Sequence, residues 1–296
     1  MTDFANTDLL VLDRVHFRYP DGGIALDGCS LAIARGSRNA LIGPNGAGKT
    51  TLFHHANGLL RPQSGEVRYA GAAIDYGRSG LGQLRSKVGM VFQNPDRQLF
   101  SASVREDVSF GPCNLGLPAD QVRRRVDRAL GVVGMDAFAD KAVHNLSFGQ
   151  KKRVCIAGVL AMEPELLILD EPMAGLDHAM QEELLMVLED LHRRGITLLL
   201  ATHDIDFAYR WSDRIHLMSA GVCTAAFSSP DLAAHSAELA AIGQPLPAVI
   251  PLHQQLLALG LTLPAAAPRS CAELSTSLAA LSLSPSYSRK ENPCPL

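Results

Sequence analysis

Long apolar runs are missing from this sequence. No uninterrupted apolar segment reaches the roughly 18 to 20 residues that a helix needs to span a bilayer. The first ten residues, MTDFANTDLL, also lack the basic start and apolar stretch of a secretory signal peptide. We therefore expect a chain that is soluble by itself and that reaches a membrane only through a partner protein.

Neither sign of charge predominates, and the cysteines are not paired in sequence. The 27 Lys and Arg residues nearly balance the 30 Asp and Glu residues, so the sequence offers no basic surface for nucleic acid and predicts no such partner. The six cysteines are scattered and form no C-x-x-C pair, which is typical of reduced thiols in a cytosolic protein. With 47% hydrophobic and 19% charged residues, the composition favours a folded chain over one that is disordered throughout.

The apolar segments that are present predict a parallel α/β sheet. ELLILD (165–170) and ITLLLAT (196–202) are short continuous apolar runs, as strands buried on both faces require. Residues 180–195 between them have the composition of a helix, and residues 39–42 form another short apolar strand. A strand–helix–strand order with buried strands indicates an α/β fold, and the segment from about 103 to 161 indicates a helical insert.

A phosphate-binding loop follows the predicted strand at 39–42. GPNGAGKT (43–50) matches G-x-x-x-x-G-K-[ST] between a strand and a helix, a context that disfavours the alternative of an incidental glycine-rich turn. Glycines let backbone N–H groups surround phosphate oxygens, Lys49 reaches the β- and γ-phosphates, and Thr50 ligates Mg²⁺. We assign ATP binding to six residues of the loop and the following helix: Asn45, Gly46, Gly48, Lys49, Thr50 and Thr51.

Polar side chains lie at the carboxyl ends of the predicted strands at 165–170 and 196–202. In LLILDEP (166–172), Asp170 is positioned to hold Mg²⁺ and Glu171 to polarise the water that attacks the γ-phosphate. The alternative is a solvated turn. His203 ends the following apolar run at the same sheet edge, where it can bond the γ-phosphate or the water, although a lone histidine is more often structural.

A further segment makes the pattern specific. In LSFGQKKR (146–153), Ser147 and Gln150 form an S-x-x-Q capping box that starts a helix. By itself this is only a well-capped helix, but LSFGQ resembles the LSGGQ signature of ATP-binding-cassette (ABC) ATPases, with Phe148 in place of the first glycine. The remaining family motifs occur in order over about residues 8–230: Tyr19, the phosphate loop, Gln93, LLILDEP, AGLD ending at Asp177, and His203.

The resemblance implies a P-loop NTPase fold of the ABC type and an ATPase built from two such domains. In that family each ATP lies between the phosphate loop of one domain and the signature of its partner, which would bring Ser147, Gly149 and Gln150 to the partner's nucleotide. Tyr19 would stack on the adenine, and Gln93 would reach Mg²⁺ and the attacking water. We expect activity to survive the replacement by Phe148, and a homodimer is the expected assembly.

The stretch FQNPDRQLF (92–100) resembles its counterpart in energy-coupling factor transporters, the vitamin and metal-ion uptake branch. There, a groove beside this stretch receives helices of a membrane-embedded coupling subunit, which works with a substrate-binding membrane subunit. Leu99 and Phe100 would pack at the groove, whereas Asn94 and Asp96 would fix the loop. Residues 146–172 further resemble the cobalt and nickel uptake ATPase of the CbiO type, so cobalt is the expected cargo and the cytoplasmic face of the membrane the expected location.

The predicted domains are a nucleotide-binding domain at 1–230, whose helical subdomain is at about 95–160, and a C-terminal helical domain at 231–296 that contributes a dimer contact. In the latter, short alanine- and leucine-rich helical segments precede a loose tail at 285–296.

Other readings remain. The same role for nickel or a vitamin such as biotin is one, and a soluble ABC ATPase of repair or translation is another. Lys49 and Asp170 are only 121 residues apart, which leaves no room for the coiled coil of repair proteins. A non-enzymatic cassette would be expected to lack Glu171 or His203. The histidines, among them His54 and His55, show no ligand spacing, so Mg²⁺ is the only metal assigned.

Overall fold

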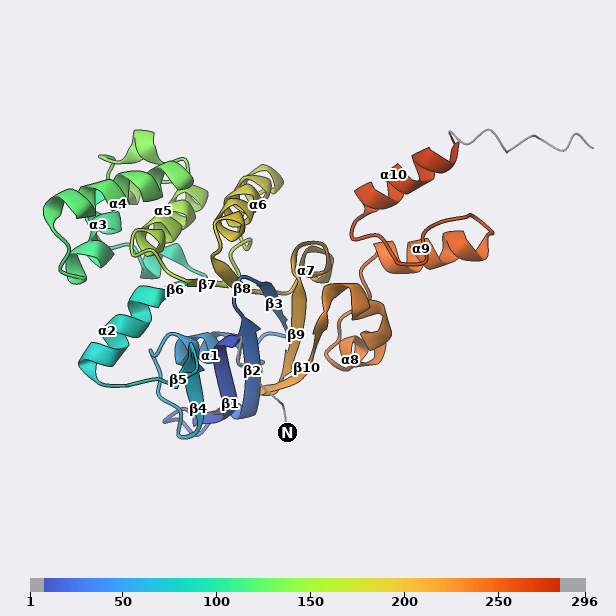
Figure 1. The fold of residues 1–296 in the computed structure, drawn as a ribbon, viewed down its shortest axis with the longest axis horizontal. Helices are drawn as coiled ribbons and strands as arrows, with labels where there is room; N and C mark the ends of the chain where they lie inside the picture. Colours follow the sequence, from blue (N-terminus) through green and yellow to red (C-terminus); the bar gives the residue numbers. More distant parts are fainter. Residues whose placement is uncertain (1–7, 283–296) are drawn as a thin grey trace, which may run out of the picture.

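The computed structural model describes residues 8–282, and its centre is a six-stranded sheet (Figure 1). The strand order is β10-β9-β3-β8-β7-β6; all neighbours are parallel except β10, which pairs antiparallel with β9. The strands are β3 (Arg38–Ile42), β6 (Val88–Val91), β7 (Leu166–Asp170), β8 (Thr197–Thr202), β9 (Arg214–Ser219) and β10 (Val222–Ser228). The predicted buried strands at 39–42, 165–170 and 196–202 are confirmed as β3, β7 and β8.

A second, antiparallel sheet packs beside the first in the order β2-β1-β4-β5. Its strands are β1 (Asp8–Arg18), β2 (Ile24–Ala34), β4 (Ser64–Tyr69) and β5 (Ala72–Ala73). Successive residues of the central strands face different cores: Ile168 of β7 joins the cluster shared with this second sheet, whereas Leu167 and Leu169 join the cluster shared with the helices. Burial on both faces explains why these strands are continuously apolar.

The helices fall into three groups. Those next to the central sheet are α1 (Lys49–Ala56), α2 (Arg78–Lys87), α6 (His178–Arg193) and α7 (Ile205–Trp211). The helical subdomain contains η1 (Pro95–Arg97), α3 (Val104–Asn114), α4 (Ala119–Val132), η2 (Asp136–Phe138), η3 (Val143–Asn145) and α5 (Phe148–Leu160). The C-terminal group contains η4 (Ser229–His235), α8 (Ser236–Ala241), α9 (Val249–Ala258) and α10 (Cys271–Ser282). Within residues 8–282, no helix combines the length and the apolar character that a membrane span requires.

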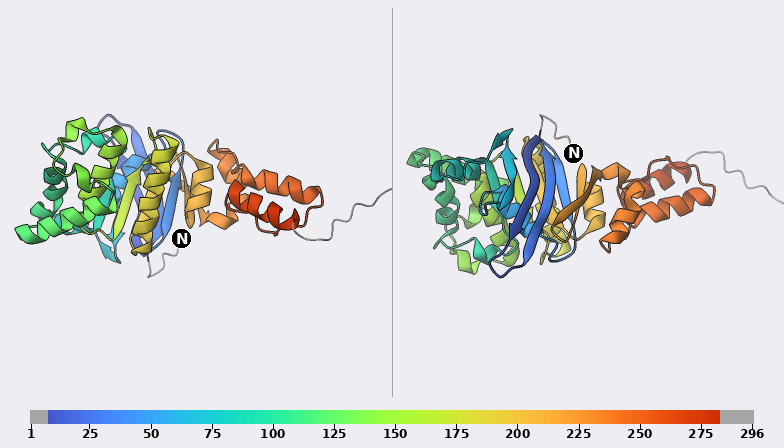
Figure 2. Two further views of the ribbon diagram at one scale, coloured as in Figure 1. Left: turned by 90° about the horizontal axis from the view of Figure 1, so that it is seen from above. Right: turned by 90° about the horizontal axis from the view of Figure 1, so that it is seen from below.

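The C-terminal helices extend from one end of the molecule, at the opposite end from the helical subdomain (Figures 1 and 2). Leu232, Leu239 and Leu274 are nevertheless buried in the same hydrophobic cluster as the helices of the ATPase region. The segment after Pro230 is helical as predicted. The predicted tail at 285–296 lies outside the described residues.

Two cysteines that are far apart in sequence meet in space. The thiol of Cys29 on β2 lies 3.4 Å from that of Cys223 on β10. Cys29 is fully buried, and the contact adds to the packing of β2 against β10. The scattered spacing of the cysteines does not predict this pair.

Candidate functional site

The phosphate loop connects β3 to α1, and its glycines are required by close backbone contacts. A Cβ atom at Gly43 would lie 2.2 Å from the carbonyl oxygen of Met218. Gly48 has a φ of +102°, and a Cβ there would lie 2.5 Å from the carbonyl oxygen of Ala25. The loop can therefore hold this shape only with glycine at these positions. Asn45 and Gly46 are exposed at the tip of the loop.

Lys49 begins α1 and turns back into the loop. Its Nζ donates hydrogen bonds to the carbonyl oxygens of Gly43 (2.7 Å) and Pro44 (3.1 Å). Burial lowers the pKa of the Lys49 ammonium, and the nearby carboxylates of Glu171 and Asp170 oppose that shift. A buried cation in a ring of backbone groups at a helix N-terminus is the arrangement that binds phosphate.

Thr50 in α1 faces Asp170, the last residue of β7. The Oγ1 of Thr50 donates to Oδ2 of Asp170 over 2.7 Å. Burial raises the pKa of the Asp170 carboxyl, and the hydroxyl of Thr50 partly offsets this. A buried carboxylate beside a hydroxyl oxygen is a donor set that suits Mg²⁺, since a cation would compensate the charge that burial disfavours.

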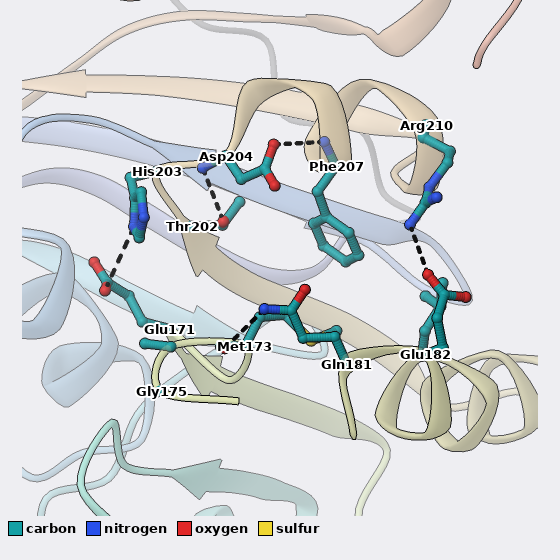
Figure 3. Close-up of a pocket in the computed structure, with 12 residues that line it drawn as sticks. Glu171, Met173, Gly175, Gln181, Glu182, Thr202, His203, Asp204, Phe207 and Arg210 are labelled. Atoms are coloured by element: carbon teal, nitrogen blue, oxygen red, sulfur yellow. Dashed lines mark hydrogen bonds and ion pairs between the residues drawn. The ribbon is translucent and has the colours of Figure 1, made fainter. Parts of the chain in front are cut away.

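The three predicted catalytic residues meet at one oxygen atom. Gln93, just beyond β6, donates from Nε2 to Oε2 of Glu171 over 3.2 Å, and Nδ1 of His203 lies 3.7 Å from the same Oε2. Figure 3 shows His203 and Glu171 facing each other at the end of a pocket of about 310 Å³. The carboxylate is thus held between an amide and an imidazole, a geometry in which it can accept a proton from a water.

Ser147, Gly149 and Gln150 begin α5, which lies in the helical subdomain apart from α1 (Figure 1). The Oγ of Ser147 accepts from the Gln150 backbone N–H (3.2 Å), and Oε1 of Gln150 accepts from the Ser147 backbone N–H (3.0 Å), so the predicted capping box is confirmed. A Cβ at Gly149 would lie 2.8 Å from the sulfur of Met180. Because α5 lies apart from α1, the structure does not bring these three residues to the phosphate loop of the same chain.

Tyr19 and Asp177 each contact the start of a different helix. The Tyr19 hydroxyl is 3.1 Å from Oγ1 of Thr51 in α1, so the ring lies beside the start of that helix, and it packs edge-on against Phe17. Asp177 caps α6, because its Oδ1 accepts from the Met180 backbone N–H over 2.8 Å.

The segment 92–100 is fixed from both sides. Oδ1 of Asn94 accepts from the Asp96 backbone N–H (3.0 Å), and Asp96 pairs with Lys151 of α5 over 2.7 Å. The prediction that these two polar residues fix the loop is confirmed. Sequence reasoning did not identify Asp107, whose buried carboxylate accepts from the backbone N–H groups of Phe100 and residue 101.

The two apolar residues that end this segment differ. Phe100 is 65% exposed and borders a groove of about 520 Å³, where its ring lies edge-on to that of Phe110 with 4.7 Å between centroids. Leu99 is partly buried against the larger hydrophobic cluster and does not line the groove. The expectation that Leu99 packs at the groove was wrong, because the turn after η1 directs consecutive side chains to different sides. The other apolar residues that line the groove include Leu59, Met90, Phe92, Leu115 and Met162.

A lysine that was not singled out from the sequence reaches the site from α5. Nζ of Lys152 donates to the carbonyl oxygens of Ala174 (2.6 Å), Pro172 (2.7 Å) and Glu171 (3.3 Å). The only available signal was a pair of lysines directly after the LSFGQ motif.

Comparison with known proteins gives a consistent answer. A family model described as ABC transporter matches residues 26–174. The energy-coupling factor transporter ATP-binding protein EcfA of Methanocaldococcus jannaschii is 50% identical over 207 residues, which are 70% of this chain and 74% of that protein. EcfA3 of Clostridium perfringens is 49% identical over 214 residues, which are 72% of this chain and 75% of that protein.

Solved structures have the same fold. CbiO1 from Clostridium perfringens, described as part of the ABC transporter complex cbiONQ, gives a TM-score of 0.72 at 43% identity and covers 85% of this chain and 99% of its own. The dimeric bacterial ABC transporter cassette MJ0796 gives a TM-score of 0.68 at 27% identity and covers 74% and 98%, respectively.

Proposed function

This chain belongs to the ABC transporter ATPases, and from that premise we propose that it powers an energy-coupling factor importer for a transition-metal ion, cobalt in the first instance. The chain hydrolyses ATP. The proposed assembly contains a second copy of the chain, an integral membrane coupling subunit and a membrane subunit that binds the cargo. The chain itself would work as a peripheral subunit at the cytoplasmic face of the membrane.

In the proposed mechanism, Lys49 and the backbone of the phosphate loop hold the β- and γ-phosphates, and Tyr19 stacks on the adenine. Thr50, Asp170 and Gln93 would hold Mg²⁺, which when bound neutralises charge on the phosphate oxygens. Glu171 accepts a proton from the attacking water, while His203 bonds the γ-phosphate or that water.

The signature residues act on the nucleotide of the partner subunit. The N-terminus of α5 offers unpaired N–H groups and the positive end of the helix dipole, both suited to a γ-phosphate. These residues lie apart from the phosphate loop of their own chain, so a complete site needs a second copy. The dimeric state of the MJ0796 cassette supports this arrangement, in which Asp177 would lie at the contact between the two copies.

One observation carries the transport role: the segment 92–100 joins the reaction centre to an apolar groove. Gln93 touches Glu171 at one end, and Phe100 borders the groove at the other. An exposed pair of aromatic rings beside an apolar groove is suited to a helix of a partner protein. We propose that helices of the coupling subunit occupy it and that hydrolysis is thereby converted to movement in the membrane.

Capture of partners from native membranes tests this function. The tagged chain is purified from gently solubilised membranes beside a Phe100→Ser, Phe110→Ser double variant, and co-purifying proteins are identified by mass spectrometry. We expect a coupling subunit and a small substrate-binding membrane protein with the unmodified chain and their loss with the variant. An eluate without integral membrane proteins, from a chain that still hydrolyses ATP, would favour the soluble ABC ATPase.

The cargo requires a separate test. The purified complex is reconstituted into vesicles with ATP inside, and uptake of labelled cobalt, nickel and biotin is compared. The similarity of residues 146–172 to the cobalt and nickel branch supports uptake of cobalt, whereas the 43% identity to CbiO1, part of an ABC transporter complex, supports the transport role. Uptake of nickel or biotin alone would support the transport function and show that the cargo is not cobalt.

A further inference from the structure

Lys152 is buried, although burial of a charged side chain costs free energy. The residue is 3% exposed and lies in the first turns of α5. Burial lowers the pKa of the Lys152 ammonium to about 8, and the groups that face it and oppose this shift are Cys155 of the same helix and Glu171 after β7. A methionine of similar volume would avoid the cost of burying a charge, so core packing alone does not account for a lysine.

The three donors of the ammonium match three carbonyl oxygens of one turn. They belong to Glu171, Pro172 and Ala174, at 3.3, 2.7 and 2.6 Å. Glu171 has a φ of +45°, a conformation that a residue with a Cβ rarely adopts, so this turn needs support from outside itself. Lys152 provides that support with charge-assisted hydrogen bonds.

Phe148 covers this contact. Its ring centroid lies 5.2 Å from Nζ of Lys152, within range of a cation–π interaction. A Cβ at Gly175 would lie 3.0 Å from the ring, so the ring also packs on the strand-to-helix turn. Phe148 keeps 41% of its surface exposed. The residue that departs from the LSGGQ motif thus touches both Lys152 and the turn that Lys152 holds.

We propose that Lys152 is a positioning residue for ATP hydrolysis, whose ammonium fixes the turn 171–174 beneath the ring of Phe148, so that the start of α5 and Glu171 move as one unit. This rests on the proposed function, in which Ser147 and Gln150 bind the nucleotide of the partner subunit. The helix that contacts the partner's ATP would then also set the orientation of the carboxylate at its own ATP.

The test compares variants of the full-length dimer. Lys152→Met removes the charge and keeps the volume, whereas Lys87→Met removes a lysine that pairs with Glu165 away from the site. We expect Lys152→Met to lower the single-turnover hydrolysis rate by about 10²-fold, as a displaced catalytic group does, with ATP affinity and melting temperature close to those of the Lys87→Met control. Lys152→Arg, which keeps the charge and donors, should recover part of the rate.

Several outcomes decide the proposal. A normal rate for Lys152→Met would overturn it, and so would equal losses in rate and ATP affinity in a folded variant. If Lys152→Met does not fold, Phe148→Leu decides instead, since it exposes the ammonium without removing it: a severalfold loss of rate that Phe148→Tyr restores supports the proposal, and an unchanged rate overturns it. Glu171→Gln, measured in parallel, distinguishes failure of this proposal from failure of the proposed function. Full activity of that variant would refute the catalytic role assigned to Glu171.

Discussion

Gln93 donates a hydrogen bond from Nε2 to Oε2 of Glu171 over 3.2 Å, which joins residues 78 positions apart in the sequence. Gln93 opens the segment that ends at Phe100 on the border of the apolar groove. Because η1 and the contacts of Asp96 and Asp107 hold this segment at several points, we expect a displacement at the groove to change the position of the amide at the carboxylate. A partner in the groove could therefore affect the reaction without touching ATP.

The carboxylate of Glu171 is the first target for substitution. Glu171→Gln keeps the shape of the side chain but removes the proton acceptor, so we expect kcat to fall by about 10² to 10⁴-fold with ATP binding retained. The ATP-bound dimer should live longer, which size-exclusion chromatography with ATP detects. Glu165→Gln, at the other end of β7, is the matched control and should keep normal turnover. Normal turnover of Glu171→Gln would show that another group accepts the proton.

Magnesium dependence tests the pair Thr50 and Asp170. Asp170→Asn removes the charge that burial already disfavours and preserves the size of the side chain. We expect the Mg²⁺ concentration for half-maximal hydrolysis to rise by about tenfold or more, because a hard cation prefers a carboxylate to a neutral amide. Hydrolysis rate against free Mg²⁺ measures this, and chelation should abolish turnover in both proteins. An unchanged Mg²⁺ requirement would exclude Asp170 as a ligand.

The groove can be separated from the chemistry. Phe100→Ser with Phe110→Ser removes two exposed rings, so the free energy of unfolding should change by no more than about 1 kcal/mol. Hydrolysis by the isolated chain should be unaffected, whereas capture of membrane partners should be lost. Met186→Ser, which changes an equally exposed apolar residue on α6, is the control and should leave capture intact. Loss of ATP binding by the double variant would show that these rings support the nucleotide site and do not act only on a partner.

The parts that the sequence predicted are those that depend on neighbours along the chain. The phosphate loop, the ends of β7 and β8, and the capping box of Ser147 follow from short motifs, and the ABC-type fold is confirmed. The meeting of Glu171 and His203 at one edge follows from the rule that parallel strands end on the same side, whereas Gln93 was predicted only from the family resemblance.

What the sequence could not predict depends on directions in space. Leu99 and Phe100 are equivalent in hydrophobicity, and only the turn after η1 sends one to the core and the other to the groove. Lys152 resembles any lysine on a helix until the turn after β7, about twenty residues later, is placed against it. Cys29 and Cys223 likewise meet only because β2 packs beside β10.

The pKa of Lys152 makes a prediction about pH. Burial lowers this pKa to about 8, so the ammonium is charged at pH 7 and largely neutral at pH 9. Deprotonation removes one of three donors and the charge that strengthens the others, so the turn that carries Glu171 loosens. We expect kcat at saturating ATP and Mg²⁺ to fall severalfold between these pH values.

Lys152→Arg isolates the group responsible, because an arginine keeps its charge throughout this pH range. Its rate at pH 7 should be below that of the unmodified chain, but the fall between pH 7 and pH 9 should be absent. ATP affinity measured at both pH values separates an effect on chemistry from one on binding. If the two proteins lose activity in parallel as pH rises, a different group titrates, and the hold of Lys152 on Glu171 does not depend on its proton.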